Sequence, residues 1–173
     1  MRTLLRLVLL ALAMSTGSAA AVTELAPPER YALQPVGQGT FRWLGLRVYD
    51  AALWAPNGRF DFSRPFALVV RYARALDGES IAERSIDEIE RLGVGSPAQR
   101  ASWSKQLRAA TPDVEAGDQI TGVYRPGRGA RFYFNGRLLG EIDDPAFSRA
   151  FFAIWLDPRT SAPELRAALI GER

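Results

Sequence analysis

The segment Phe132–Gly171, FYFNGRLLGEIDDPAFSRAFFAIWLDPRTSAPELRAALIG, decides the fold of this chain. Asn135-Gly136 supplies the two residues of positive φ that a type I′ hairpin requires, and apolar residues alternate on both sides of it. Asp144 precedes Pro145, so a side-chain acceptor stands at an N-cap and proline fills the first helical position. The segment therefore predicts a hairpin, a helix from Pro145, a connector and a short closing helix.

The helix after Pro145 is predicted to be mostly buried. Its apolar residues recur at the i, i+3, i+4, i+7 and i+8 positions of one helix face. They are Phe147, Ala150, Phe151, Ile154 and Trp155. Phe152 and Leu156 leave little polar surface on the remaining side.

The part of the chain before this segment predicts three strands and then two helices. Tyr31 to Trp54 is rich in β-branched, aromatic and aliphatic residues and predicts two strands, and Phe66 to Tyr72 predicts a third. In the second strand we expect alternating faces. One face carries Leu44, Leu46 and Val48, and the other carries Phe41, Trp43, Arg47 and Tyr49.

The two helices in the middle of the chain have recognisable starts. Ser80 and Glu83 fit a capping box for a helix that ends at Gly93, and Ser96-Pro97 opens a second helix that ends at Thr111-Pro112. A strand over residues 120–124 and a turn over 126–129 then lead into the hairpin. The order β-β-β-α-α-β-β-β-α-α predicts an α+β fold, with an antiparallel sheet backed by a layer of helices.

The N-terminal 21 residues have the pattern of a secretory signal peptide. Arg2 and Arg6 precede an apolar run from Leu7 to Met14, and small residues follow up to Ala20 and Ala21. We expect cleavage near Ala20 or Ala21, a domain over residues 22–173, and a periplasmic or secreted protein. An uncleaved membrane tether is the alternative.

Composition excludes several classes of site. The 173 residues include no cysteine and no histidine, which removes disulfides, thiolate and histidine catalysis, and nearly every transition-metal site. We therefore expect no metal and no cofactor. Loss of Arg2 and Arg6 with the leader leaves 20 basic against 19 acidic residues, and the arginines are scattered. Nucleic acid is not expected as a partner.

Three blocks of the sequence resemble the chalcone isomerase-like proteins, in particular their exported bacterial branch. The blocks are LGLRVYDAALWAP (Leu44 to Pro56), TPDVEAGDQITGVYRPGRGARFYFNGRLLGEI (Thr111 to Ile142) and DPAFSRAFFAIWLDPRTSAPELRAALIG (Asp144 to Gly171). The resemblance implies an open-faced β-sandwich with a cleft between the sheet and the helices. It also implies a chalcone-closing enzyme, a relative that binds fatty acids, or a member of a branch with no known reaction.

The polar residues that the resemblance assigns to the enzymes are not matched in this chain. Their strand threonine falls on Leu44 and their late-helix hydroxyl on Ile154, while Ile81 and Glu88 are the nearest positions to their helical tyrosine and asparagine. Arg30 stands near the position of their arginine. Because electrostatic stabilisation of an enolate or phenolate requires such polar donors, we expect no chalcone isomerase activity.

The candidate ligand-binding residues are apolar residues of the cleft together with two arginines. The apolar set could line a pocket or interdigitate as solid core, and patterning does not separate the two. Arg30 and Arg42 could pair with a ligand carboxylate, or could lie on the surface or over an aromatic ring. The complete set is Arg30, Arg42, Leu44, Leu46, Val48, Trp103, Phe151 and Ile154.

Three functions remain open at this point. The first is a non-catalytic protein that binds a small hydrophobic ligand, a fatty acid among the candidates. The second is an enzyme of unknown substrate that uses tyrosine, arginine and carboxylate groups in the same cleft. The third is an accessory protein that docks a partner through an outer sheet face carrying Phe41, Trp43 and Tyr49.

Overall fold

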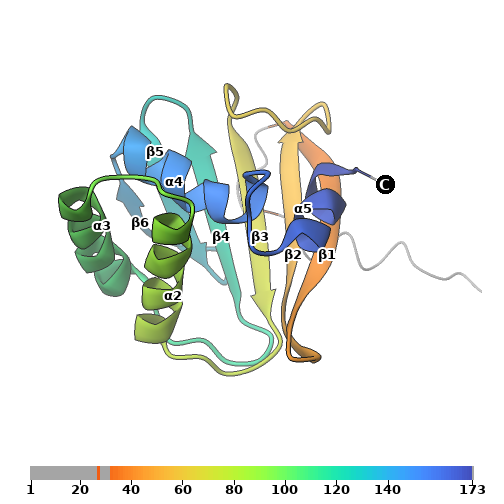
Figure 1. The fold of residues 1–173 in the computed structure, drawn as a ribbon. Coiled ribbons are helices and arrows are strands. Elements are labelled where there is room, and N and C mark those ends of the chain that lie inside the picture. The colour runs from red at the N-terminus through yellow and green to blue at the C-terminus, as the bar shows by residue number, and fades with distance from the viewer. Residues whose placement is uncertain (1–26, 28–31, 173) are drawn as a thin grey trace, which may run out of the picture.

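A computed structural model describes Pro27 and residues 32–172, in which a six-stranded antiparallel sheet carries helices on one face (Figure 1). The strands lie in the sheet in chain order: β1 (Leu33–Trp43), β2 (Leu46–Pro56), β3 (Phe66–Tyr72), β4 (Gln119–Arg125), β5 (Gly129–Phe134) and β6 (Arg137–Ile142). The helices are α2 (Gly78–Arg91), α3 (Pro97–Ala110), α4 (Pro145–Leu156) and α5 (Pro163–Ile170).

The element order and the fold class predicted from the sequence are confirmed. Three strands, two helices, three strands and two helices follow one another as expected, and the helices back an antiparallel sheet. The predicted leader, residues 1–21, lies outside the described residues. No helix of the described part of the chain combines the length and the apolar character that a membrane span requires.

Two hairpin turns share one backbone geometry. The predicted turn at Asn135-Gly136 joins β5 to β6 with φ values of 48° and 81°, and Leu44-Gly45 joins β1 to β2 with 49° and 80°. The expected continuous strand through Leu44 is therefore wrong. Apolar residues on both sides of this turn resemble one strand, but Gly45 supplies a left-handed conformation that reverses the chain.

Side-chain caps fix where the helices begin. Ser96 caps α3 as predicted, and its hydroxyl accepts a hydrogen bond from the backbone N–H of Gln99 at 3.2 Å. The predicted cap of α2 at Ser80 is wrong, because Asp77 accepts from the N–H of Ser80 at 2.8 Å and the helix begins at Gly78. An aspartate three residues ahead is an equally good N-cap.

Asp144 caps α4 and also joins it to α3. Its carboxylate accepts from the backbone N–H groups of Ala146 and Phe147 at 2.8 and 2.9 Å, and from the indole N–H of Trp103 at 2.8 Å. Trp103 is buried, so this contact satisfies an indole donor that has left water. One carboxylate thus sets both the start of α4 and its position against α3.

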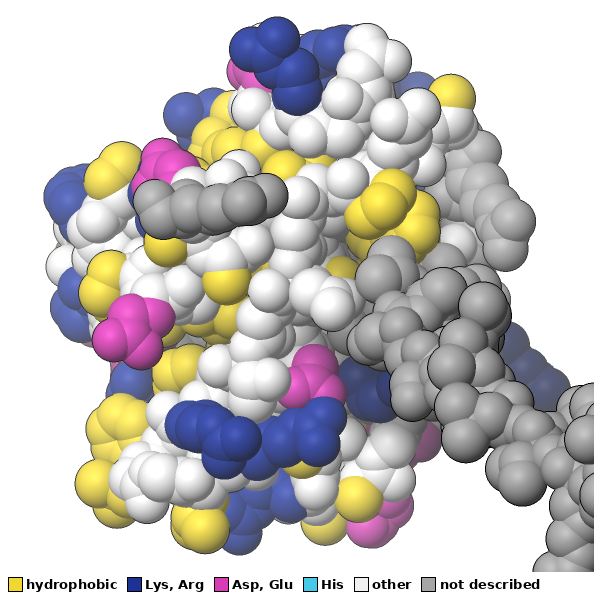
Figure 2. Space-filling model, turned by 90° about the vertical axis from the view of Figure 1, so that its right-hand side faces the viewer, with side chains coloured by type: hydrophobic (Ala, Val, Ile, Leu, Met, Phe, Trp, Pro, Cys, Tyr) yellow, Lys and Arg dark blue, Asp and Glu magenta, His cyan; other side chains and the backbone are white. Residues whose placement is uncertain are grey.

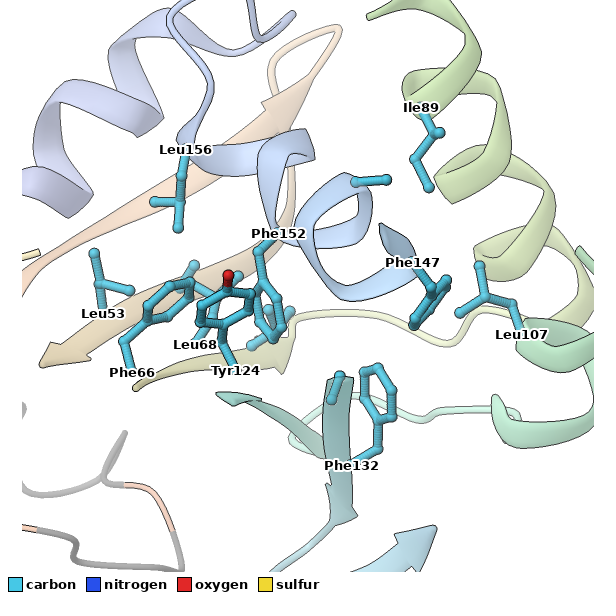
Figure 3. Close-up of a cluster of buried hydrophobic side chains, with 14 of the residues drawn as sticks. Leu53, Phe66, Leu68, Ile89, Leu107, Tyr124, Phe132, Phe147, Phe152 and Leu156 are labelled. Carbon is cyan, nitrogen blue, oxygen red and sulfur yellow. The ribbon is translucent and has the colours of Figure 1, made fainter. Parts of the chain in front are cut away.

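An aromatic cluster fills one part of the space between sheet and helices (Figure 3). Phe66 stacks on Tyr124 with ring centroids 4.7 Å apart, and Phe152 of α4 meets Phe66 edge to face at 5.1 Å. Phe147 and Leu156 extend the same buried cluster along α4. In this region the layers interdigitate as solid core.

Helix α5 packs against β1 because two strand positions lack a side chain. A Cβ at Gly37 would lie 2.1 Å from the carbonyl oxygen of Ala168, and one at Gly39 would lie 2.8 Å from Leu165. Gly37 and Gly39 therefore permit close approach of the closing helix.

We predict that Asp144→Ala lowers the free energy of unfolding by about 2 kcal/mol, because it removes a helix cap and leaves the buried indole N–H of Trp103 without an acceptor. Urea unfolding followed by circular dichroism measures this change. Asp143→Ala is the matched control, because the Asp143 side chain is 75% exposed and pairs with Arg125. Equal losses in the two variants would contradict the assigned role of Asp144.

Candidate functional site

A pocket of about 530 Å³ lies between the inner face of the sheet and helices α2 and α4. This volume falls within the range of roughly 300–1,000 Å³ that is common for small-molecule sites. Strands β1 to β6 supply one wall, and α2, α4 and the end of α3 supply the other. Its apolar lining includes Leu68, Val70, Ile120, Phe132, Phe151 and Ile154.

The side of α4 that bears Phe151 forms an aromatic wall of the pocket. The Phe151 ring lies 5.3 Å from both Phe132 and Trp155, in edge-to-face contacts. These contacts hold the rings against the sheet, while the adjacent residue Phe152 packs into the aromatic cluster around Phe66. The space between the layers is therefore filled in one part and hollow in another.

Tyr49 places a neutral hydroxyl in this apolar space. Its oxygen accepts a hydrogen bond from the indole N–H of Trp155 at 3.0 Å, and its ring stacks on Phe41 with centroids 5.0 Å apart. Burial raises the pKa of Tyr49 to about 12, although the Trp155 hydrogen bond opposes this shift. The Tyr49 proton has no acceptor among the described residues, which leaves it available to a ligand.

Tyr72 lies opposite Tyr49 on the neighbouring strand. The two residues are partners in the β2–β3 register, and their rings meet edge to face at 6.1 Å. Burial also raises the pKa of Tyr72 above its ordinary value. Both phenols line the pocket and stay protonated at neutral pH.

Glu88 is a buried carboxylate at the helix wall of the pocket, with 6% of its surface exposed. It accepts hydrogen bonds from Arg84 at 2.7 Å, Arg91 at 2.8 Å and the hydroxyl of Ser161 at 2.9 Å. Burial alone would raise the pKa of Glu88, but the hydrogen bonds from Arg91 and Ser161 and the charges of both arginines outweigh it and lower the pKa. Glu88 therefore ties α2 to the segment between α4 and α5.

Two arginines and a tryptophan line the pocket where it meets the surface. The guanidinium of Arg84 lies 5.7 Å from the centre of the Trp43 ring. Arg84 is also paired with Glu88, whereas Arg74 is exposed and makes no ion pair with any residue in the described part of the chain. Arg74 is therefore the lining cation that is available to an anionic ligand.

The structure brings three of the sequence-predicted site residues to the pocket and separates the others from it. Val48, Phe151 and Ile154 line it. Trp103 is buried beside Phe147, with ring centroids 6.1 Å apart, and belongs to the core instead. Three predicted site residues of the β1–β2 hairpin, Arg42, Leu44 and Leu46, also do not line the pocket. Arg30 lies outside the described residues.

The assignment of Leu44 to the enzymes' strand threonine fails for a structural reason. Counting back from Val48-Tyr49 assumes an unbroken strand, but the chain reverses at Leu44-Gly45 and the Leu44 side chain points into solvent. The hydroxyl that the structure places on this strand in the pocket is that of Tyr49. The pocket is thus less depleted of polar groups than the sequence indicated.

Sequence analysis missed Tyr49, Tyr72, Arg74 and Arg84 as pocket residues. The two tyrosines come together only through the β2–β3 register, which no local pattern reveals. Glu88 carried a detectable signal, because it follows Ile81 by seven residues on one face of α2. Both Ile81 and Glu88 line the pocket.

The expected outward-facing aromatic patch is also not formed. Phe41, Trp43 and Tyr49 line the pocket beneath the helices instead of presenting a docking surface on the opposite face of the sheet. Among the described residues, no group of three or more carboxylates is placed to hold a metal ion.

Comparison with known proteins gives one family and two relatives. Residues 21–171 match the family model described as chalcone isomerase-like. An uncharacterised protein of Haemophilus influenzae is 31% identical over 140 residues, which cover 80% of this chain and 68% of that protein.

The crystal structure of a fatty-acid binding protein of Arabidopsis thaliana has the same fold. It superposes with a TM-score of 0.61 at 13% sequence identity, over 81% of this chain and 87% of that one. The likeness concerns the arrangement of the sheet and helices.

We predict that Glu88→Gln lowers the free energy of unfolding at pH 7 by about 1–2 kcal/mol, because it replaces the ionised acceptor of two arginines and Ser161. The pKa of Glu88 is lowered by folding, so its stabilisation is present above the unfolded value of about 4.3 and disappears as pH falls through the folded value. The difference between the wild type and Glu88→Gln should therefore shrink below about pH 4. Denaturant unfolding at a series of pH values measures it.

Glu90→Gln on the same helix is the control for this experiment. The Glu90 side chain is 64% exposed and pairs with Arg100, so its loss should change stability by less than about 0.5 kcal/mol at either pH. A pH-independent cost of Glu88→Gln would show that the carboxylate charge does not stabilise the fold.

Proposed function

The chain belongs to the chalcone isomerase-like family, and from that premise we propose that it binds a small hydrophobic ligand, a fatty acid, in the pocket between sheet and helices. The single observation that carries the proposal is the pocket itself, a hollow of about 530 Å³ beside the packed aromatic core. Small-molecule sites combine apolar walls with a few polar anchors, and this pocket has that composition.

The polar groups are arranged to suit a carboxylate at the surface and an alkyl chain inside. Arg74 lines the pocket, is exposed and has no ion-pair partner in residues 32–172, so it is placed to pair with a ligand carboxylate at little cost in desolvation. The inner wall offers apolar side chains such as Phe151 and Ile154. The structural likeness to a protein named for fatty-acid binding supports this choice of ligand.

The titrating groups of the pocket favour binding over acid–base catalysis. A general acid or base works best with a pKa near the operating pH. Here both pKa values move away from neutral pH: the pKa of Tyr49 rises to about 12, and the pKa of Glu88 falls below its ordinary value. Glu88 is also held by two arginines, so it is poorly placed to take a proton from a substrate.

The proposed location of the protein follows from the leader. Residues 1–21 have the composition of a cleavable signal peptide, so we assign the domain to the periplasm or the exterior of the cell. Mass spectrometry of the protein recovered from the cell envelope would test this, with an N-terminus near Ala20 or Ala21 as the expected result.

Isothermal titration of the delipidated protein with palmitate is expected to give saturable binding. Ser85→Trp should weaken it at least about tenfold, because Ser85 lines the pocket and an indole there would occupy the space of the ligand. Ser102→Trp is the matched control, since Ser102 is exposed on α3 and does not line the pocket. No saturable binding of any fatty acid, from short to long chains, would contradict the proposed function.

A second experiment tests the orientation of the ligand. Arg74→Gln should weaken palmitate binding about tenfold, because one charge-assisted contact is lost, and should leave hexadecanol binding unchanged. Arg59→Gln, an arginine outside the pocket lining, provides the control. An equal effect of Arg74→Gln on the acid and the alcohol would show that Arg74 does not contact the carboxylate.

A further inference from the structure

The turn between β1 and β2 presents three large apolar side chains to solvent. Trp43 is 58% exposed, Leu44 is 87% exposed and Leu46 is 57% exposed. They are consecutive apart from Gly45, so the whole tip of this hairpin is apolar. Scattered exposed apolar residues are common in proteins, but a contiguous group of this kind marks an interaction site.

Leu44 occupies a backbone position that leucine disfavours. Its φ of 49° matches the 48° of Asn135 at the same place in the β5–β6 turn, where asparagine is the residue that tolerates this conformation. Leu44 gains no packing in return, because its side chain is almost fully exposed. Asparagine would suit this position better, so local folding does not account for the leucine.

Basic residues surround the apolar tip. Arg42 and Arg47 flank the turn, and the Arg84 guanidinium lies over the Trp43 ring. Residues 40–50 contain one acidic residue, Asp50, and it is paired with Arg47. Figure 2 shows hydrophobic and basic side chains close together at the lower end of the molecule, where Figure 1 places the β1–β2 turn. Tryptophan, leucine and arginine in this arrangement suit the interface of an anionic bilayer.

The tip is continuous with the pocket. Trp43 is both exposed at the hairpin and part of the pocket lining, and Arg84 beside it also lines the pocket. A surface that binds the hairpin would therefore meet the edge of the pocket as well. A turn of this size cannot bury the roughly 800 Å² per partner of a standard protein interface, whereas single apolar side chains can insert among lipid headgroups.

We propose that the β1–β2 hairpin tip, residues 42–47, docks on the surface of an anionic phospholipid bilayer and brings the edge of the pocket to that surface. Leu44 and Leu46 insert between the headgroups, Trp43 lies at the interface, and Arg42 contacts a lipid phosphate. This goes beyond ligand binding. The docking does not require an occupied pocket, so it can hold or fail independently of the proposed function.

Vesicle co-sedimentation tests the proposal, with the exported protein and vesicles of phosphatidylglycerol and phosphatidylethanolamine. The double variant Leu44→Asn, Leu46→Thr should reduce partitioning about tenfold or more, because two inserted side chains are lost. All variants share one N-terminus, so any contribution of residues before Leu33 is the same in each. Binding should also fall in pure phosphatidylcholine vesicles and at high salt.

Two controls separate docking from folding and from general hydrophobicity. Leu44→Asn alone should leave the melting temperature unchanged or raise it, because Asn135 shows that asparagine fits this turn. Leu138→Thr removes an equally exposed leucine, 57% as for Leu46, from β6 at the opposite edge of the sheet, and should leave partitioning unchanged.

Three results would overturn the proposal. The first is that the wild type does not bind vesicles. The second is that Leu138→Thr loses as much vesicle partitioning as the double variant. The third is that the double variant binds vesicles as the wild type does, while sedimentation velocity shows that it has changed from a dimer to a monomer. The last result would assign the tip to a second copy of the chain. Palmitate titration of the same variants, expected to be unaffected, reports on the pocket separately.

Discussion

The position of helix α4 depends on the Asp144 carboxylate, and the pocket depends on α4. Asp144 accepts two backbone N–H groups at the start of the helix and the buried indole N–H of Trp103 on α3. Burial would raise the pKa of Asp144, but these hydrogen bonds lower it, so the group stays ionised and holds all three donors. With its start fixed, α4 carries Phe152 into the aromatic core and Phe151 to the pocket wall.

The pocket is a consequence of uneven packing between two rigid layers. Around Phe66 and Tyr124, rings from the sheet and from α4 interlock, so that this part of the interior is solid. Towards Tyr49 the sheet and α4 are joined by a hydrogen bond from the Trp155 indole to the Tyr49 hydroxyl. Polar groups there form hydrogen bonds in place of close packing, which leaves volume for a ligand.

Much of the fold could be predicted from the sequence because its signals are local. The Asn135-Gly136 turn, the Asp144-Pro145 helix start and the helix from Ser96 each depend on neighbouring residues, and all three are confirmed. The pocket depends on strand register and on which layer each side chain meets. Periodicity puts Trp103 and Ile154 equally inside, but only the tertiary packing assigns Trp103 to the core and Ile154 to the pocket.

The turn at Leu44 shows how one local misinterpretation changes a functional argument. Taken as strand, Leu44 indicated that a polar residue of the cleft had been replaced by hydrocarbon; as a turn residue it says nothing about the cleft, where Tyr49 supplies a hydroxyl. The error arose because leucine is an unusual residue at positive φ, so pattern analysis favours a strand. A residue that opposes its own backbone conformation, with no packing in exchange, is informative for the same reason: selection for folding does not explain it, whereas the proposed bilayer contact would.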